Sequence, residues 1–219
     1  MDNKSKLLIE QIYKIGIIPV TTLHDPENDA IALCEALRLG GINVIEITFR
    51  ADGAQKAIYD IKNRFPDMLV GAGTVVCEEQ VRAAQGSGAD FIVSPGFDLG
   101  VVKCCKKMKI DIFPGCATAT DYQAALGCGL EVLKFFPAEQ SGGVAKIKAL
   151  SAPFPNFKII PTGGISLDNI GDYLSEPSVL ACGGSYMVAQ KLIEDKKWDK
   201  ITEFCHMTCE KIKEIRGNG

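Results

Sequence analysis

Two charged residues stand inside short apolar segments of this sequence. Glu46 lies in NVIEITF, residues 43–49, and Lys134 lies in EVLKFF, residues 131–136. Taking a charge out of water is costly unless the charge is paired or put to use. A lysine amine that desolvation makes nucleophilic can attack a ketone, and a nearby carboxylate can move the protons that the reaction requires. The pair therefore points either to a structural ion pair or to Schiff-base chemistry.

The alternation of side chains along a β-strand tells which way these two residues face. Successive side chains point to opposite faces, with a period of two. In residues 43–49 this puts Glu46 and Thr48 on one face, with Arg50 just beyond, and the isoleucines and the phenylalanine on the other. The apolar face should meet helices. Lys134 likewise faces away from its apolar neighbours, so we expect Glu46 and Lys134 to share one interior.

Eight short apolar runs alternate with longer amphipathic segments along the chain. This rhythm predicts parallel strands joined by crossover helices. The number of units, and the lack of a GxGxxG motif after the first run, favour a closed (β/α)8 TIM barrel over an open sheet. We expect one domain over residues 1–219 with an N-terminal helix. The expected strands are 16–23, 43–49, 69–74, 90–94, 110–114, 131–136, 158–162 and 179–182, and the expected helices are 28–39, 53–64, 77–86, 98–108, 118–127, 143–150, 167–174 and 197–215.

Polar and apolar residues at the carboxyl ends of the expected strands could form a substrate pocket, because barrel chemistry sits at that end. Thr74 ends the expected third strand, where it can donate a hydrogen bond at the mouth, and Arg50 can pair there with a substrate carboxylate. Pro95 and Phe136 can supply an apolar wall.

Two glycine pairs follow the last two expected strands. Gly163 and Gly164 end the seventh, and Gly183 and Gly184 end the eighth, before a short helical segment. Glycine lets backbone N–H groups approach a ligand closely, and a helix N-terminus attracts anions. Tight turns alone would also explain glycines. The loops after strands seven and eight are, however, the recurrent phosphate site of such barrels, so two pairs at matching places favour a phosphate.

Composition excludes several partners. The net charge of -3 over 219 residues gives no basic field for nucleic acid or for an anionic membrane surface. No apolar run is long enough to span a membrane, and the first residues do not form a signal peptide. Nine cysteines without a CxxC pair suggest reduced thiols and a cytoplasmic protein. Cys205, His206 and Cys209 could suggest a metal, but we expect helix packing and no metal site.

A series of motifs, taken in order, resembles the family of 2-keto-3-deoxy-6-phosphogluconate (KDPG) and 4-hydroxy-2-oxoglutarate (KHG) aldolases. The match runs from about residue 15 to residue 190. The motifs are IEITFR (45–50), GAGTV (71–75), SPG (94–96), FPG (113–115), LKFFPA (133–138), PTGGI (161–165) and GGS (183–185).

The resemblance implies a metal-independent class I aldolase, usually a homotrimer. Such an enzyme needs no cofactor, because the substrate forms a covalent Schiff base with a lysine of the enzyme. It releases pyruvate and glyceraldehyde 3-phosphate from KDPG, and pyruvate and glyoxylate from 4-hydroxy-2-oxoglutarate. It assigns the Schiff base to Lys134 and proton transfer to Glu46. It also assigns the substrate carboxylate to Arg50 and Thr74, the pocket lining to Pro95, Phe136 and Thr162, and the phosphate to Gly163, Gly164 and Ser185, beside Gly184.

Three positions depart from the motifs of that family. Asp121 stands where glutamate is expected, Tyr186 where tryptophan is common, and Ala51 where threonine is frequent. None removes a group that the chemistry needs, although Asp121 and Tyr186 could alter substrate preference. The alternatives to a KDPG aldolase are an enzyme whose main substrate is 4-hydroxy-2-oxoglutarate, a phosphate-binding barrel isomerase or epimerase, and a non-catalytic sugar-phosphate-binding protein.

Overall fold

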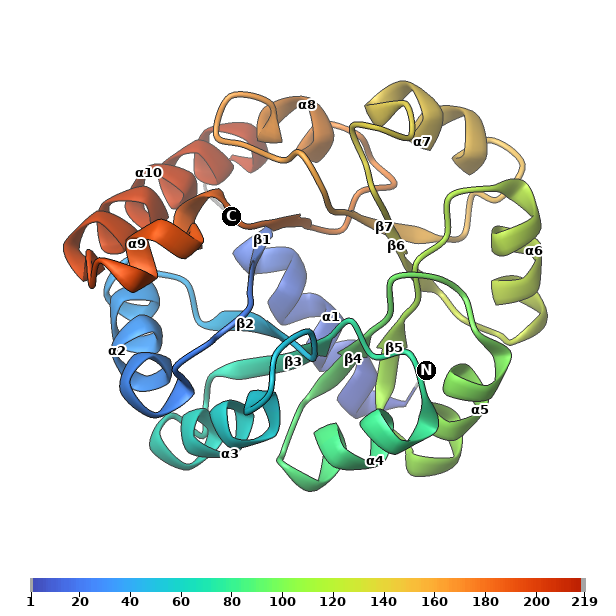
Figure 1. The fold of residues 1–219 in the computed structure, drawn as a ribbon. Coiled ribbons are helices and arrows are strands. Elements are labelled where there is room, and N and C mark those ends of the chain that lie inside the picture. Colours follow the sequence, from blue (N-terminus) through green and yellow to red (C-terminus); the bar gives the residue numbers. More distant parts are fainter. Residues whose placement is uncertain (1, 218–219) are drawn as a thin grey trace.

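The computed structural model describes residues 2–217 as parallel strands that alternate with helices (Figure 1). The strands are β1 Ile17–Thr21, β2 Val44–Thr48, β3 Leu69–Gly73, β4 Phe91–Val93, β5 Asp111–Phe113, β6 Val132–Phe135, β7 Lys158–Pro161 and β8 Cys182–Gly184. The helices are α1 Asn3–Ile15, α2 Pro26–Leu39, α3 Ala54–Arg64, α4 Glu78–Gly86, α5 Leu99–Met108, α6 Ala119–Gly127, α7 Gly143–Ser151, α8 Ile170–Leu174, the 3-10 turn η1 Tyr186–Val188, α9 Gln190–Glu194 and α10 Trp198–Arg216.

Backbone hydrogen bonds close the strands into a ring. Six strands form one sheet in the order β5-β4-β3-β2-β1-β8, and β6 pairs with β7. Between β5 and β6, the Lys134 N–H donates to Pro114 O at 3.0 Å, and the Cys116 N–H donates to Lys134 O at 2.8 Å. Between β7 and β8, the Leu180 N–H donates to Ile159 O at 2.8 Å. Helices surround this ring in Figure 1, so the prediction of a (β/α)8 barrel is confirmed.

Local sequence explains where several helices begin. Asp98 caps α5, because its carboxylate accepts the Val101 N–H at 2.8 Å. Thr118 and Asp121 form a reciprocal capping box at the start of α6. Such caps satisfy N–H groups that have no partner inside the helix. The α1 helix, capped by Asp2, lies across one end of the strand ring, behind the strands in the view of Figure 1.

The last strand differs from its expected position. Residues 179–182 were expected, but the strand is Cys182–Gly184, and Val179 makes only an isolated bridge to Ile159. The glycines belong to the strand because of crowding inside the barrel. A Cβ atom at Gly183 would lie 2.3 Å from Thr162 Oγ1, so a side chain has no room there. Helix α8 also begins three residues later than the expected 167, at Ile170.

Candidate active site

Glu46 on β2 and Lys134 on β6 meet inside the barrel. Lys134 Nζ lies 3.6 Å from Glu46 Oε1, and only 7% and 4% of the two side chains are exposed. Among the described residues, no donor lies within hydrogen-bond distance of Glu46 Oε1. The Lys134 amine also lies 5.1 Å from the centre of the Phe136 ring. An amine and a carboxylate are thus held next to each other, away from water, with acceptor capacity left unused.

Glycine on a neighbouring strand makes room for the Glu46 carboxylate. Glu46 pairs in register with Gly71, and its side chain extends toward Gly73 at the carboxyl end of β3. A Cβ atom at Gly73 would lie 2.2 Å from Glu46 Oε1. Below this level the interior is filled, because a Cβ atom at Gly71 would collide with the Phe91 ring at 2.2 Å. The packing therefore directs the carboxylate toward the open end of the barrel.

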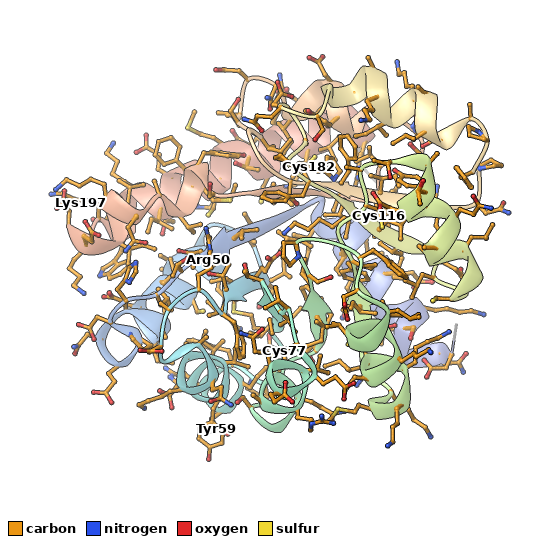
Figure 2. The ribbon with its side chains drawn as sticks, turned by 45° about the vertical axis from the view of Figure 1, so that its right-hand side comes forward. Arg50, Tyr59, Cys77, Cys116, Cys182 and Lys197 are labelled. Atoms are coloured by element: carbon orange, nitrogen blue, oxygen red, sulfur yellow. The ribbon has the colours of Figure 1, made fainter. Side chains whose placement is uncertain are left out.

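Arg50, labelled in Figure 2, is held at the mouth by a chain of hydroxyl groups. Arg50 Nε donates to Thr48 Oγ1 at 3.3 Å, and the hydroxyls of Thr48 and Thr22 lie 2.7 Å apart. The inward direction expected for Thr48 agrees with this contact. Thr22 was not among the residues expected in the site. Its signal in the sequence was its place near the carboxyl end of the expected first strand, 16–23; in the structure it directly follows β1.

Most of the expected pocket residues line one cavity at the carboxyl ends of the strands. This mouth cavity has a volume of about 180 Å³. It contains the expected residues Arg50, Phe136, Thr162, Gly163, Gly164, Gly184 and Ser185, together with Val20, Ile165 and Gly183. Four expected site residues are not among its lining residues: Glu46, Lys134, Thr74 and Pro95. Thr74 directly follows β3 and has a left-handed backbone with φ 58°, and Pro95 is exposed in the loop after β4.

The loop after β7 turns its carbonyl groups toward donors of the protein. Ala138 N–H donates to Thr162 O at 2.8 Å, and Glu139 N–H donates to Gly163 O at 3.1 Å. Asn169 Nδ2 donates to Gly164 O at 2.9 Å. These bonds tie the glycines to the segment that follows Lys134. The helix dipoles expected to help an anion are weak here, because η1 has only three residues and α8 only five.

The two departures that we expected to alter substrate preference contact other parts of the protein. Asp121 Oδ2 accepts the N–H groups of Ala117 and Thr118 at 3.0 and 2.9 Å, so its carboxylate shapes the start of α6. The Tyr186 hydroxyl lies 2.7 Å from Thr208 Oγ1 on α10. Neither residue lines the mouth cavity.

The cysteines near the C-terminus pack rather than gather around an ion. Cys205 is fully buried, and burial raises the pKa of its thiol to about 12. The Cys209 thiol donates to Gly40 O at 3.5 Å. Within residues 2–217 no group of three or more histidine, cysteine, aspartate or glutamate side chains is arranged to hold a metal ion. In the same range, no helix combines the length and the apolar character needed to cross a membrane.

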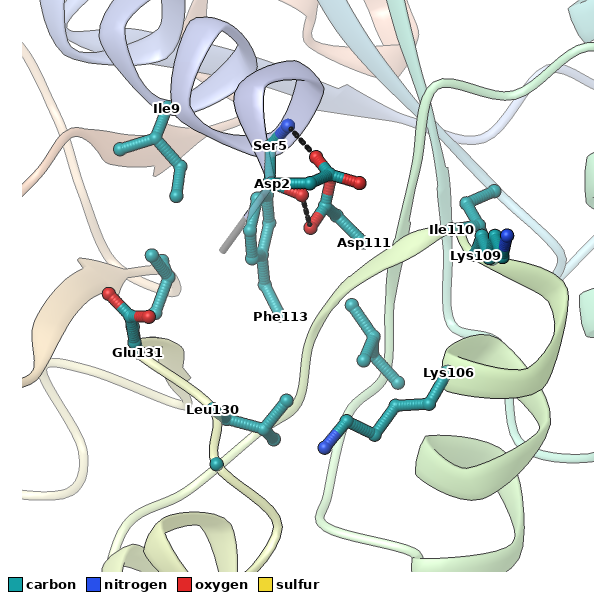
Figure 3. Close-up of a pocket in the computed structure, with 13 residues that line it drawn as sticks. Asp2, Ser5, Ile9, Lys106, Lys109, Ile110, Asp111, Phe113, Leu130 and Glu131 are labelled. Carbon is teal, nitrogen blue, oxygen red and sulfur yellow. Dashed lines mark hydrogen bonds between the residues drawn. The ribbon is translucent and has the colours of Figure 1, made fainter.

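A second cavity lies at the opposite end of the barrel, under α1 (Figure 3). This basal cavity has a volume of about 390 Å³ and is lined by residues of α1, α5, β5 and β6. Four of its polar side chains make hydrogen bonds within the protein. Asp2 Oδ1 accepts the Ser5 N–H at 2.9 Å, Ser5 Oγ donates to Asp111 Oδ1 at 2.8 Å, and Lys106 Nζ donates to Cys128 O. Although larger, the basal cavity lacks a buried reactive pair.

A closed parallel barrel with a buried amine and carboxylate at the carboxyl ends of its strands has the architecture of a barrel enzyme. The family model of KDPG and KHG aldolases matches residues 8–204. The chain is 43% identical to the 2-dehydro-3-deoxy-phosphogluconate aldolase of Haemophilus influenzae, over 97% of this chain and 100% of that protein. It is 36% identical to the KHG/KDPG aldolase of Escherichia coli K12, over 95% and 98% of the two chains.

Solved structures agree with the relatives found by sequence. The crystal structure of a KDPG aldolase from Legionella pneumophila, with pyruvate captured at low pH as a covalent carbinolamine intermediate, superposes with a TM-score of 0.88. It is 39% identical, and the match covers 91% of this chain and 97% of that one. The chain belongs to the KDPG and KHG aldolase family. The predicted family is therefore confirmed, and with it the choice of an aldolase over an isomerase or a sensor.

Proposed function

We propose that this protein is a class I aldolase that cleaves KDPG to pyruvate and glyceraldehyde 3-phosphate, with Lys134 as the Schiff-base residue. The observation that carries this proposal is the buried Lys134 amine, 3.6 Å from a Glu46 oxygen that has no hydrogen-bond donor among the described residues. A purely structural ion pair would be expected to close to hydrogen-bond distance, because a buried polar atom without a hydrogen bond is costly. A residue that transfers protons, by contrast, needs an oxygen that is free to accept a proton from the substrate.

The first steps form the covalent intermediate. The neutral Lys134 amine attacks the C2 ketone, and the ketone oxygen becomes the hydroxyl of a carbinolamine. Glu46 shuttles the protons, through water where needed, and loss of that hydroxyl as water leaves an iminium. A separation of 3.6 Å is longer than a hydrogen bond. Such contacts are often long in unliganded enzymes and tighten when the substrate is bound.

The carbon–carbon bond then breaks toward the iminium. The electron pair of the C3–C4 bond moves into the C2–C3 bond, and the iminium nitrogen accepts the displaced electrons to give an enamine. Glu46 takes the C4 hydroxyl proton, so C4 leaves as the aldehyde of glyceraldehyde 3-phosphate. The enamine gains a proton at C3, and water hydrolyses the resulting iminium to pyruvate and free Lys134.

The residues around the mouth hold the two charged ends of the substrate. Arg50 and Thr74 bind the carboxylate at C1, while Pro95, Phe136 and Thr162 line the space around the reacting carbons. The phosphate binds at Gly163, Gly164, Gly184 and Ser185. Binding energy at the phosphate, remote from the bond that breaks, holds the C4 hydroxyl in register with Glu46.

Borohydride reduction in the presence of pyruvate tests the Schiff base directly. The expected result is a reduced pyruvoyl adduct on the peptide that contains Lys134, found by mass spectrometry. Protein treated with borohydride alone and Lys134→Ala protein treated with both reagents are the controls, and neither should carry the adduct. An unmodified Lys134 peptide in active enzyme would overturn the proposal.

A second substrate, 4-hydroxy-2-oxoglutarate, is favoured by the name of the Escherichia coli relative, KHG/KDPG aldolase. This compound has no phosphate. Ser185→Asp adds a negative charge where the phosphate of KDPG should bind, so it should impair KDPG cleavage and leave 4-hydroxy-2-oxoglutarate cleavage nearly unchanged. Equal losses for both substrates would argue against a phosphate at Ser185.

The family resemblance also supports a homotrimer, and the nine free cysteines of the described residues support work in the reducing cytoplasm. Sedimentation equilibrium should give three times the mass of one chain. A monomer at micromolar concentration would contradict the trimer.

A further inference from the structure

Tyr186 follows the expected phosphate residue Ser185 and is tied to a helix on the outside of the barrel. Its hydroxyl lies 2.7 Å from Thr208 Oγ1, and Thr208 is fully buried on α10. Thr208 Oγ1 also lies 2.7 Å from Phe204 O, which can only accept. The single hydroxyl hydrogen of Thr208 is therefore used on Phe204, and Tyr186 is the donor to Thr208.

The Tyr186 ring lies close to the glycine of the same turn. A Cβ atom at Gly184 would lie 3.2 Å from Tyr186 Cε1, which is tighter than ordinary contact. The Val188 N–H donates to Ser185 O at 3.2 Å and closes the turn. Burial raises the pKa of Tyr186 to about 12, so its hydroxyl keeps the proton it donates at neutral pH. The Tyr186 side chain thus packs against the Gly184–Ser185 backbone and limits its movement.

The helix that receives this hydrogen bond is itself anchored at several points. Thr202 Oγ1 donates to Ala36 O on α2 at 3.0 Å, and Arg216 Nη2 donates to Leu180 O before β8 at 2.8 Å. Cys205 of α10 packs against Gly40, where a Cβ atom would lie 2.3 Å from the Cys205 Cβ. Tyr186 therefore connects the turn to a firmly held part of the fold.

We propose that Tyr186 is a positioning residue, whose hydrogen bond to Thr208 holds the Gly184–Ser185 backbone in the conformation that receives a phosphate. This inference rests on the proposed aldolase function. Tyr186 does not line the mouth cavity, so it acts through the turn and not by contact with the substrate. Its effect should fall on phosphorylated substrates, because unphosphorylated pyruvate binds at Lys134 without needing this turn.

The first test compares Tyr186→Phe with the unchanged protein. One hydrogen bond contributes enough to shift binding roughly five- to tenfold. We expect the KM for KDPG to rise by about that factor, and kcat to fall as well if the C4 hydroxyl loses its register with Glu46. The pyruvate concentration that gives half-maximal borohydride trapping should not change. Tyr59→Phe is the matched control, because Tyr59 is exposed on α3 and points away from the barrel (Figure 2).

A double variant separates positioning from general damage. Thr208→Val leaves the hydroxyl of the partly buried Tyr186 without its acceptor, which is worse than removing both partners. We expect Thr208→Val to raise the KM for KDPG more than Tyr186→Phe does, and the double variant Tyr186→Phe/Thr208→Val to recover to the level of Tyr186→Phe.

The outcomes distinguish this inference from the proposed function. If the unchanged protein neither cleaves KDPG nor traps pyruvate, the aldolase proposal itself fails. If it does both, and Tyr186→Phe leaves the KM for KDPG unchanged or weakens pyruvate trapping to the same extent, the positioning role of Tyr186 is overturned.

Discussion

The two ends of the barrel each hold a cavity, but they treat their polar groups in opposite ways. In the basal cavity, Asp2, Ser5 and Asp111 satisfy one another, and Lys106 donates to a carbonyl. At the mouth, a buried carboxylate oxygen of Glu46 lacks a hydrogen-bond donor among the described residues and lies 3.6 Å from a buried amine. The basal cavity is the larger of the two, at about 390 Å³ against about 180 Å³. The buried pair of amine and carboxylate, and not the cavity volume, therefore distinguishes the mouth from the basal end.

Both ends also carry a residue other than glycine in the left-handed region, with a different context. Thr74 at the mouth has φ 58°, and it is β-branched, which makes that conformation unusually costly. Lys109 at the basal end has φ 56° and closes helix α5, a place where this conformation is common. Strain at the mouth has no such structural role, which supports a functional one.

The largest expected effect comes from removing the amine at the mouth. Lys134→Ala should lower kcat for KDPG by at least about a thousandfold, because no covalent intermediate can form. Lys106→Ala is the matched change in the basal cavity and should leave kcat unchanged. Steady-state assays of pyruvate release measure both, and circular dichroism should confirm that both variants are folded. A comparable loss in Lys106→Ala would remove the contrast between the two ends.

The next effect should come from the carboxylate. Glu46→Gln keeps the shape but cannot accept a proton, so kcat should fall roughly 10²- to 10⁴-fold. The borohydride adduct on Lys134 should still form, only more slowly, because the amine is intact. Single-turnover trapping with pyruvate and borohydride measures the rate at which this adduct forms. If the Glu46→Gln variant cleaved KDPG at the wild-type rate, another group would have to transfer the proton.

Replacing the strained residue Thr74 at the mouth should raise the stability of the fold and weaken substrate binding. Thr74→Gly relieves the left-handed strain, so the free energy of unfolding should rise by about 1 kcal/mol. The KM for KDPG should rise, because the hydroxyl proposed to bind the carboxylate is lost. Lys109→Gly should bring a similar gain in stability with unchanged kinetics. Urea titrations and initial rates measure the two effects, and a Thr74→Gly enzyme with unchanged KM would contradict the binding role.

The smallest effect is expected where the polar groups are already satisfied. Ser5→Ala removes the hydrogen bond to Asp111 and should cost about 1 kcal/mol or less of unfolding free energy. Activity should not change. A drop in kcat for Ser5→Ala at full folding would mean that the basal end communicates with the mouth.

Much of the fold could be predicted because each element carries its own periodic pattern. The second strand, expected at 43–49, is Val44–Thr48, and the third helix, expected at 53–64, is Ala54–Arg64. The eighth strand was misplaced because its glycines resemble a loop, and glycine has low strand propensity. Residue 183 must be glycine because a Cβ atom there would collide with Thr162, which follows β7. This contact joins residues far apart in the sequence, so no local pattern could predict it.

The sequence by itself determined which face Glu46 and Lys134 occupy, because strand side chains alternate with a period of two whatever the neighbours are. It also determined the family, through a series of motifs that follow one another along the chain in the order typical of that family. Only the tertiary structure decided that Arg50 lines the same cavity as the two glycine pairs, that Thr22 joins the hydroxyl chain, and that Tyr186 donates to Thr208. Those contacts join separate elements, and their geometry depends on how the whole barrel closes.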